Sequence, residues 1–231
     1  MFRFKQFSIQ QETAAFKVGT DSCLFGAWLS VEGINKALDV GTGTGLLSLM
    51  LCQRDPSLTI TAIEKHHESA EEANCNFEQS PWSSNLQLIQ ADYREWASKQ
   101  SFDLILSNPP YFRNSKHSSE AEKSLARHQE GLSSFELLSK AKNLLNPEGR
   151  IAMILPVFEM SIALKEAADL GLFPLRICKL RPLPHKDCHR VMVELRQTEQ
   201  SPISEEIIIE YERGDYSPEA TLLLKDFLLK L

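Results

Sequence analysis

Three glycines with an acid ahead of them stand in the stretch Asp39-Val-Gly-Thr-Gly-Thr-Gly45, between a strand-like run and a helical one. Because glycine has no Cβ, such a turn stays tight and lets the backbone approach a ligand closely. Dinucleotide-binding turns read G-x-G-x-x-G and hold a pyrophosphate on the helix N-terminus. The spacing here is G-x-G-x-G, and Asp39 would repel a pyrophosphate but attract the cationic α-amino group of a methionine moiety. The candidate binding residues of this turn are Asp39, Gly41, Thr42, Gly43 and Gly45.

Polar residues also stand at or just after the ends of the next three strand-like runs, namely Glu64, Asp92 and Asn108. In an open α/β sheet, ligands bind outside the carboxyl ends of the strands. The Glu64 carboxylate can accept hydrogen bonds from both hydroxyls of a ribose, and Asp92 can accept one from the exocyclic amine of an adenine. Tyr93 stands where it could flank the adenine ring. Together with Asp39, these residues predict a site for S-adenosylmethionine.

The run Asn108-Pro109-Pro110-Tyr111 predicts the kind of group that receives the methyl. The prolines have no N–H donor and fix φ, so the carbonyl groups stay free to accept hydrogen bonds. The Asn108 side-chain oxygen and the Pro109 carbonyl can then bind both hydrogens of a planar NH₂ group, while Tyr111 offers an aromatic face for stacking. Such an amine is a poor nucleophile, and two well-placed acceptors favour the positive charge that develops on it. This chemistry needs neither a nucleophilic side chain nor a general base.

The elements that must position these residues alternate along the chain between short apolar runs and amphipathic helical stretches. The expected parallel strands are 37–40, 59–63, 86–90, 102–107 and 150–155. The runs 175–180 and 191–195 are joined by a loop without a helix, so we expect them to pair antiparallel at one edge. The pattern predicts a doubly wound, Rossmann-like α/β fold with a seven-stranded, mostly parallel sheet and an antiparallel edge strand.

The length of 231 residues predicts a single domain over residues 1–231, in which 1–36 cover the cofactor and 197–231 add a strand and an apolar helical tail. No apolar run approaches the roughly 20 residues of a membrane helix, and the N-terminus has no secretory pattern. Five cysteines without a C-x-x-C pair indicate reduced thiols, and therefore a cytoplasmic protein. His185, Cys188 and His189 lack a fourth partner, so we expect no metal.

The chain resembles class I methyltransferases that modify amino groups, and most closely the bacterial tRNA1(Val) adenine-37 N6-methyltransferases. The glycine turn and the Asn108–Tyr111 run are typical of the whole class. Three narrower stretches indicate the family: Phe16-Lys-Val-Gly-Thr-Asp21, Ala126-Arg-His128, and Arg181-Pro-Leu-Pro-His185 with His189-Arg-Val191. One departure is His66, where many relatives have a second acid two residues after Glu64.

The resemblance implies methyl transfer from S-adenosylmethionine to the N6 amine of the adenine beside the anticodon. It also implies that Lys17, Gly19 and Thr20 lie over the methionine end of the cofactor. An unpaired loop base costs less to extract than a paired one, and the RNA backbone needs cationic contacts. The net charge of −6 hides a basic segment, 176–196, with six Lys or Arg against two Asp or Glu. The expected RNA contacts are Arg113, Lys116, Arg127, His128, Arg181, His185, Lys186 and Arg190.

The first four of these contacts belong to a long loop, 112–131, which we expect to be poorly ordered without RNA. Two other substrates would suit the same amine chemistry. A protein N5-glutamine methyltransferase has a helical domain ahead of the glycine turn, but only 38 residues precede Asp39. A DNA adenine-N6 methyltransferase usually has a target-recognition domain, of which the sequence shows no sign. A cofactor-binding module without catalysis is disfavoured by the intact Asn108–Tyr111 run. We infer no obligate protein partner.

Overall fold

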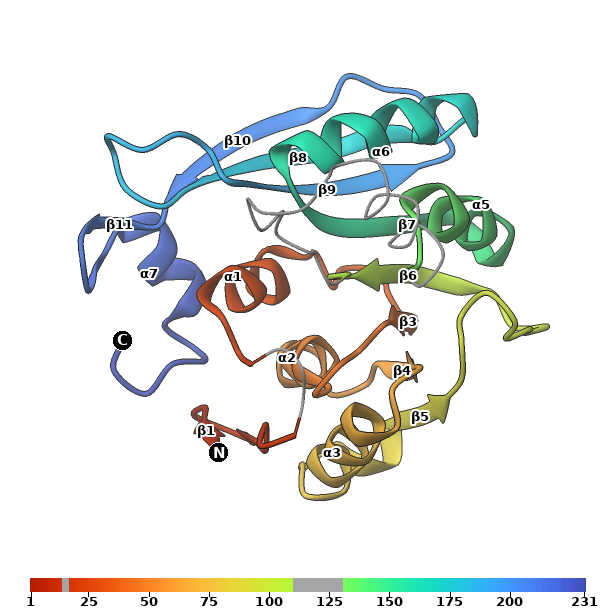
Figure 1. The fold of residues 1–231 in the computed structure, drawn as a ribbon, viewed down its shortest axis with the longest axis horizontal. Coiled ribbons are helices and arrows are strands. Elements are labelled where there is room, and N and C mark those ends of the chain that lie inside the picture. Colours follow the sequence, from red (N-terminus) through yellow and green to blue (C-terminus); the bar gives the residue numbers. More distant parts are fainter. Residues whose placement is uncertain (14–16, 110–130) are drawn as a thin grey trace, which may run out of the picture.

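The computed structural model describes residues 1–13, 17–109 and 131–231, which form a sheet between two layers of helices (Figure 1). Within those residues the main sheet has eight strands in the order β10-β8-β9-β7-β6-β3-β4-β5. Their bounds are β3 (Lys36–Val40), β4 (Thr59–Glu64), β5 (Leu86–Gln90), β6 (Phe102–Ser107), β7 (Leu145–Pro156), β8 (Phe173–Arg181), β9 (Arg190–Arg196) and β10 (Ile203–Ile208). All run parallel except β9, which is antiparallel to both β7 and β8. The doubly wound α/β fold is therefore confirmed.

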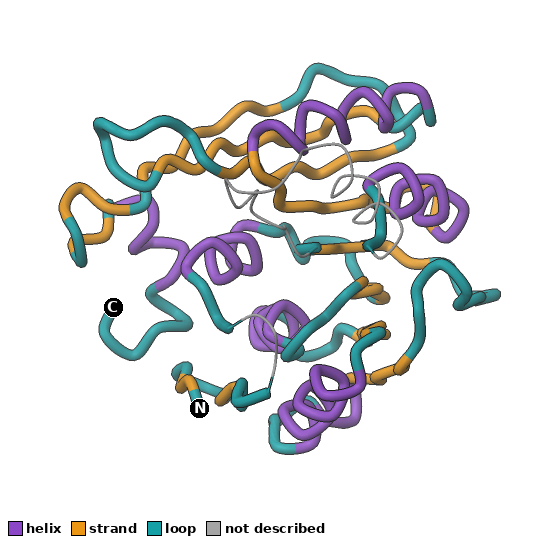
Figure 2. Tube along the Cα trace, in the orientation of Figure 1, coloured by secondary structure: helices purple, strands orange, loops and turns teal. Residues whose placement is uncertain are grey.

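Helices cover both faces of the sheet, as the tube view shows (Figure 2). One face carries α1 (Thr20–Trp28), α2 (Leu46–Arg54), α3 (His67–Glu78) and α7 (Pro218–Leu224), and the other carries α5 (Ser134–Leu144) and α6 (Val157–Asp169). A short 3-10 helix, η1 (Ser83–Asn85), precedes β5. Each layer of helices buries its own apolar cluster against the sheet, with Phe25 and Met50 in one cluster and Leu138 and Met153 in the other. None of the described helices is long and apolar enough to cross a membrane.

The antiparallel pairing expected for 175–180 and 191–195 is confirmed by β8 and β9. The structure adds an eighth strand beyond the predicted seven, because β10 pairs in parallel with β8 at that end of the sheet. Side-chain contacts of Glu205 help to hold β10 there: Trp28 Nε1 donates to Glu205 Oε2 at 2.8 Å, and Arg176 forms an ion pair with Glu205 at 3.0 Å. These partners are far apart in sequence, so the local pattern predicts a strand within 197–231 but not its pairing with β8.

The first and last parts of the chain lie side by side. Strands β1 (Phe2–Arg3) and β2 (Ser8–Ile9) form a hairpin, and Phe4, which lies between them, forms an isolated antiparallel bridge with Leu228. Lys5 Nζ donates to the carbonyl groups of Lys225 and Leu231. A second hairpin, β11 (Glu210–Glu212) with β12 (Asp215–Tyr216), precedes α7. The expected helical tail is shorter than predicted, because α7 ends at Leu224 and the chain then turns towards the N-terminal segment.

The turn between β3 and α2 positions the candidate site, and its last glycine has no room for a side chain. Gly45 has a φ of 82° directly before α2. A Cβ at Gly45 would overlap the ring of Phe77, a buried residue of α3. Both the backbone conformation and the packing of α3 against the turn therefore require glycine here.

We predict that Gly45→Ala lowers the free energy of unfolding by about 2–5 kcal/mol, since a left-handed backbone costs about 1–2 kcal/mol and overpacking about 1–3 kcal/mol. Gly33→Ala is the matched control, because Gly33 also has a positive φ of 73° but faces open space. It should cost only about 1–2 kcal/mol. Urea unfolding of both variants measures the difference, and equal losses would contradict the role of Phe77.

Candidate active site

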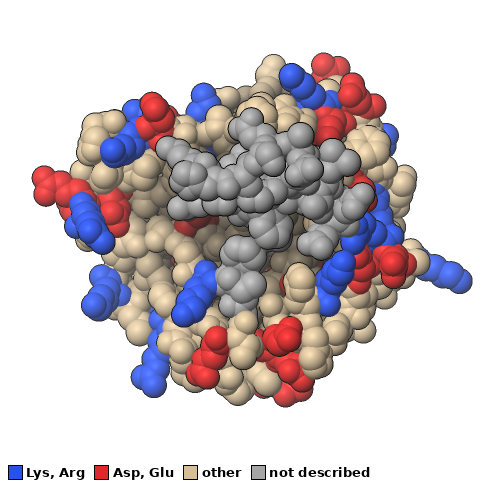
Figure 3. Space-filling view, viewed as in Figure 1, with Lys and Arg blue, Asp and Glu red and all other residues tan. Residues whose placement is uncertain are grey.

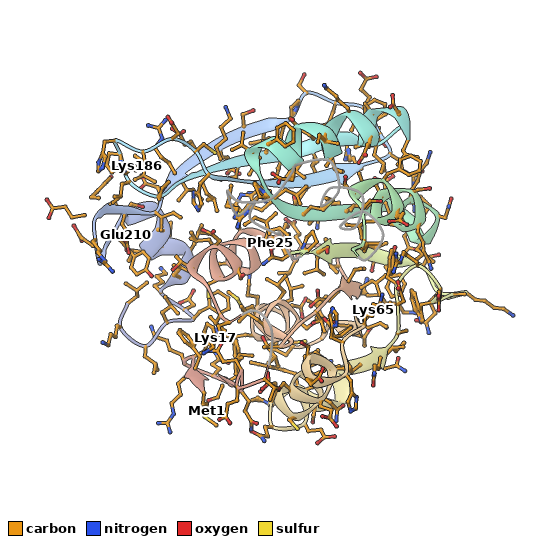
Figure 4. The ribbon with its side chains drawn as sticks, in the orientation of Figure 1. Met1, Lys17, Phe25, Lys65, Lys186 and Glu210 are labelled. Atoms are coloured by element: carbon orange, nitrogen blue, oxygen red, sulfur yellow. The ribbon has the colours of Figure 1, made fainter. Side chains whose placement is uncertain are left out.

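The carboxyl ends of β6, β3, β4 and β5 lie next to one another, because these strands are neighbours in the sheet and run parallel. Asn108, Gly41, Glu64 and Asp92 stand at or just after those four ends. The backbone N–H of Gly41 donates to the Ile63 carbonyl at 2.8 Å, which joins the glycine turn to β4. In Figure 4, Lys17, ahead of α1, and Lys65, which follows β4, lie to either side of α2. The structure thus brings these predicted residues to one edge of the sheet.

Asp39 is a fully buried carboxylate with one unsatisfied oxygen. Its Oδ2 accepts hydrogen bonds from Thr42 Oγ1 at 2.7 Å and from Ser48 Oγ at 2.8 Å. Its Oδ1 is buried and has no hydrogen-bond partner among the described residues. Burial raises the pKa of Asp39 to about 6, with the charge of Glu64 adding to the rise and the bonds from Thr42 and Ser48 opposing it. A cationic donor such as an α-amino group would satisfy Oδ1 and stabilise the ionised form.

The glycine turn leaves open space beside this carboxylate. Gly41 and Gly43 have φ values of 70° and 58°, and a Cβ built on either would meet nothing within 4 Å. The N–H of Gly43 donates to Glu64 Oε2 at 2.9 Å, and the N–H of His66 donates to Oε1 at 2.9 Å. Glu64 is therefore held between the turn and its own strand end. Each of its oxygens has a second lone pair with which to accept a ribose hydroxyl.

Asp92 is oriented by two cations. Arg94 Nη2 lies 2.6 Å and Lys65 Nζ lies 3.0 Å from Asp92 Oδ2, and Arg94 Nε lies 3.0 Å from Oδ1. The hydrogen bond from Arg94 is the largest influence and outweighs partial burial, so the pKa of Asp92 is well below its usual range. Asp92 is thus an ionised acceptor, as binding an adenine amine requires. An incoming amine would share oxygens that already accept from Arg94.

Tyr93 lies inside the apolar cluster rather than at an open surface. Its side chain is 4% exposed, and its ring stacks on Trp96 with centroids 6.4 Å apart. The ammonium group of Lys140 lies 4.9 Å from the Tyr93 ring centroid and donates to the Tyr93 and Trp96 carbonyls. Burial raises the pKa of Tyr93. These contacts hold the backbone that carries Asp92, and contact of Tyr93 with an adenine ring stays a prediction.

Asn108 and Pro109 follow β6 and are both half-buried. Asn108 Nδ2 donates to Ser22 Oγ of α1 at 2.9 Å, so the side-chain oxygen of Asn108 is the end of the amide turned away from Ser22. Pro110, Tyr111, Arg113, Lys116, Arg127 and His128 lie outside the described residues, as does the loop whose order we predicted. The candidate acceptor pair is thus described at Asn108 and Pro109.

The segment ahead of α1 reaches the same edge. Gly19 is the N-cap residue of α1, Lys17 is exposed and Thr20 is half-buried. The N–H of Val18 donates to Gln11 Oε1 at 2.6 Å, which ties this segment to the residues after β2. Since Ser22 in the first turn of α1 bonds Asn108, residues 17–20 lie close to the amine-acceptor position. Their contact with a cofactor stays a prediction.

The basic loop between β8 and β9 is joined to α1 by Asp21. His189 Nε2 lies 3.1 Å and Arg190 Nε lies 3.4 Å from the Asp21 carboxylate. His189 Nδ1 also lies 3.1 Å from the Leu180 carbonyl. Burial alone would raise the pKa of Asp21, but the bond from His189 and the charges of His189 and Arg190 together lower it. The start of β9 is thereby held against the first turn of α1.

Among the other candidate RNA contacts in this loop, His185 and Lys186 are exposed. Arg181 forms an ion pair with Glu206 at 3.2 Å. On the face that Figure 3 shows, Lys and Arg side chains are spread around the periphery with Asp and Glu among them. The described residues contain no group of three or more His, Cys, Asp or Glu side chains that could hold a metal ion.

Sequence reasoning did not identify Asp21 and Ser22 as site residues. The available signal for Asp21 was its place at the end of the Phe16–Asp21 stretch, as an acid in the first turn of a helix. For Ser22 the sequence carries no signal, since its partner Asn108 is 86 positions away.

A family model described as "methyltransferase small domain" matches residues 14–165. A protein from Pseudoalteromonas translucida named "tRNA1(Val) (adenine(37)-N6)-methyltransferase" is 37% identical over 230 residues, which cover 100% of this chain and 99% of that protein. A protein of the same name from Trichodesmium erythraeum is 39% identical over 233 residues, covering 99% of this chain and 98% of the relative.

Solved structures share the fold at lower sequence identity. The structure described as "a predicted O-methyltransferase" from Agrobacterium tumefaciens is 17% identical, has a TM-score of 0.68, and covers 88% of this chain and 95% of its own. The glycopeptide N-methyltransferase MtfA, solved with S-adenosylmethionine, is 13% identical with a TM-score of 0.55, and covers 84% of this chain and 93% of its own. These likenesses establish the class I methyltransferase fold.

We predict that S-adenosylmethionine binding weakens below about pH 6, because protonation of Asp39 removes the charge that attracts the α-amino group. The dissociation constant should rise towards tenfold per pH unit below the pKa. Asp39→Asn should bind weakly at pH 7 and lose this dependence. Calorimetry between pH 5 and 7 measures both effects. Asp55→Asn, at the other end of α2, is the control and should behave as the unmodified protein does. If the dissociation constant of the wild-type protein does not change between pH 5 and 7, the role of Asp39 is contradicted.

Proposed function

This chain belongs to the tRNA1(Val) (adenine(37)-N6)-methyltransferase family, and we propose that it transfers a methyl group from S-adenosylmethionine to the N6 amine of the adenine at position 37 of tRNA1(Val). The observation that carries the proposal is the junction of two sites at one edge of the sheet. Asp39, next to the last residue of β3, has an unsatisfied buried carboxylate oxygen, and Asn108 follows the neighbouring strand β6. The first suits the cofactor and the second suits the amine.

S-adenosylmethionine supplies an electrophilic methyl group on a sulfonium, and the sulfur becomes a neutral thioether after transfer. Asp39 would hold its amino group, Glu64 its ribose hydroxyls and Asp92 its adenine amine. The open space at Gly41 and Gly43 supports this assignment, because a backbone without Cβ atoms lets a ligand come close. The cofactor role of each residue is part of the proposal.

The adenine amine would be held by the Asn108 side-chain oxygen and the Pro109 carbonyl. Its nitrogen lone pair is delocalised into the ring, so attack on the methyl carbon needs a group that stabilises positive charge on nitrogen. Two oxygen acceptors supply that stabilisation and also hold the amine in line for transfer. The bond from nitrogen to the methyl carbon forms as the carbon–sulfur bond breaks, and the nitrogen then loses one proton to water. No covalent intermediate with the protein is needed.

A tRNA substrate fits the exposed part of the β8–β9 loop, where Lys186 carries a positive charge. His185 and Lys186 lie in this loop, whose base is held at the active-site edge through Asp21. Arg181 and Arg190 already have acidic partners, so Lys186 is the cation of this loop best placed to meet phosphate. A tRNA substrate also places the proposed reaction in the cytoplasm.

The proposed function is tested by incubating the purified protein with labelled S-adenosylmethionine and, separately, unmodified tRNA, duplex DNA or a release factor. We expect label in tRNA, recovered after digestion as N6-methyladenosine at position 37. Label in DNA or at a protein glutamine would leave the amine chemistry in place and contradict the tRNA assignment.

Asn108→Ala should abolish most of the turnover while leaving S-adenosylmethionine binding nearly unchanged, because it removes an acceptor for the amine. Loss of a single preorganised polar group in an active site typically costs about 10²–10³-fold in kcat. Single-turnover methylation and calorimetry measure the two effects separately. Weak cofactor binding with normal turnover would reverse the assignment of Asn108.

Lys186→Ala should reduce the steepness of the plot of log K for tRNA binding against log salt concentration. The slope should change by about 0.7–0.9, as expected for the loss of one phosphate contact. Lys99→Ala is the control, because Lys99 is also exposed but precedes the amino end of β6, away from the candidate site. Binding titrations at several salt concentrations compare the variants. Equal slopes would place the RNA on another surface.

A further inference from the structure

Two consecutive side chains in the first turn of α1 contact different parts of the candidate active site. Ser22 Oγ accepts from Asn108 Nδ2 at 2.9 Å, and the Asp21 carboxylate binds His189 Nε2 at 3.1 Å and Arg190 Nε at 3.4 Å. Asn108 follows β6, whereas His189 and Arg190 stand where the basic loop enters β9. One helical turn therefore joins the amine-acceptor residue to the loop that carries the candidate RNA contacts.

The contact of Ser22 sets how the Asn108 amide lies. Rotation about the terminal torsion of an asparagine side chain is soft, so its hydrogen-bond partners decide where the oxygen points. With Nδ2 directed at Ser22, the oxygen is directed away from α1 and is available to the substrate amine. Without Ser22 the amide loses this partner, and a rotated amide would present its own NH₂ hydrogens to the NH₂ group of the adenine.

The contacts of Asp21 act on the other side of the same turn. Asp21 is ionised, half-buried and bonded to two neighbouring residues, and one of these, His189, is also bonded to the backbone of β8. This set of bonds fixes the base of the β8–β9 loop relative to α1. Removing the negative charge would release the loop without touching Asn108.

From these contacts we propose that Asp21 and Ser22 are positioning residues of the methyl transfer: Ser22 orients the Asn108 amide towards the amine, and Asp21 holds the β8–β9 loop beside it for tRNA. This inference rests on the proposed function and deepens it. It assigns separate kinetic roles to adjacent residues. Ser22 acts after the substrate is bound, and Asp21 acts on how tightly tRNA is bound.

Steady-state methylation of tRNA by Ser22→Ala and Asp21→Asn tests this division. Ser22→Ala should lower kcat about 3- to 10-fold, as expected for one neutral hydrogen bond, and leave the KM for tRNA unchanged. Asp21→Asn should raise the KM for tRNA about 10-fold or more, as expected for bonds between charged groups, and leave kcat nearly unchanged. Calorimetry should show unaltered S-adenosylmethionine binding in both variants.

Matched controls separate positioning from loss of helix stability. Ser22→Thr keeps the hydroxyl oxygen and should restore kcat. Ser161→Ala removes a hydroxyl from α6 that bonds the Phe158 carbonyl, and Asp55→Asn neutralises an acid at the end of α2; neither should change kcat or KM.

A normal kcat in Ser22→Ala, or a normal KM for tRNA in Asp21→Asn, would overturn the inference. The inference would also be overturned if both variants had weaker cofactor binding, a lower kcat and a higher KM for tRNA. Such combined changes would indicate a structural role for the turn. If the wild-type protein methylates tRNA and both variants have its kcat and KM, only this inference is contradicted. Absence of wild-type activity on tRNA would contradict the proposed function and the inference together.

Discussion

The parallel pairing of β3 with both β4 and β6 is the constraint on which the candidate site depends. Val40 pairs with Ile63, and Asp39 pairs with Leu106, so three strands end at nearly the same level. Because parallel strands present their carboxyl ends together, groups separated by tens of residues in sequence become neighbours in space. A shift of one residue in either pairing would turn the side chains of β3 to the opposite faces and remove Asp39 from the turn.

The site concentrates negative charge that the protein itself only partly compensates. Asp39 and Glu64 are both buried, and their partners are hydroxyl and backbone N–H groups rather than cations. Burial of carboxylates without a cation is unfavourable, which is why the pKa of Asp39 is raised. Asp92 differs, because Lys65 and Arg94 neutralise it. A cationic ligand would thus find its electrostatic partner at the glycine turn, at the end of β3, rather than beyond β5.

Much of this arrangement could be predicted from local sequence, and the rest depended on contacts between distant residues. The run that forms β6 coincides with the predicted 102–107, because a strand buried on both faces is nearly continuous in apolar residues. The place of Glu64 beside the glycine turn follows from the same logic. A strand within 197–231 was also expected, but its pairing with β8 could not be predicted, and neither could the contact of Ser22, since each depends on partners at large sequence separation.

The meeting of the two ends of the chain has a consequence for synthesis. Phe4 pairs with Leu228, and Lys5 bonds the carbonyl groups of Lys225 and Leu231. On the ribosome, the N-terminal hairpin with its aromatic residues therefore emerges long before its C-terminal partner. Contacts of such long sequence separation close late, because their loop-closure entropy must be met first. The hairpin that leads into the residues ahead of α1 is thus expected to be among the last parts of the molecule to settle into its native packing.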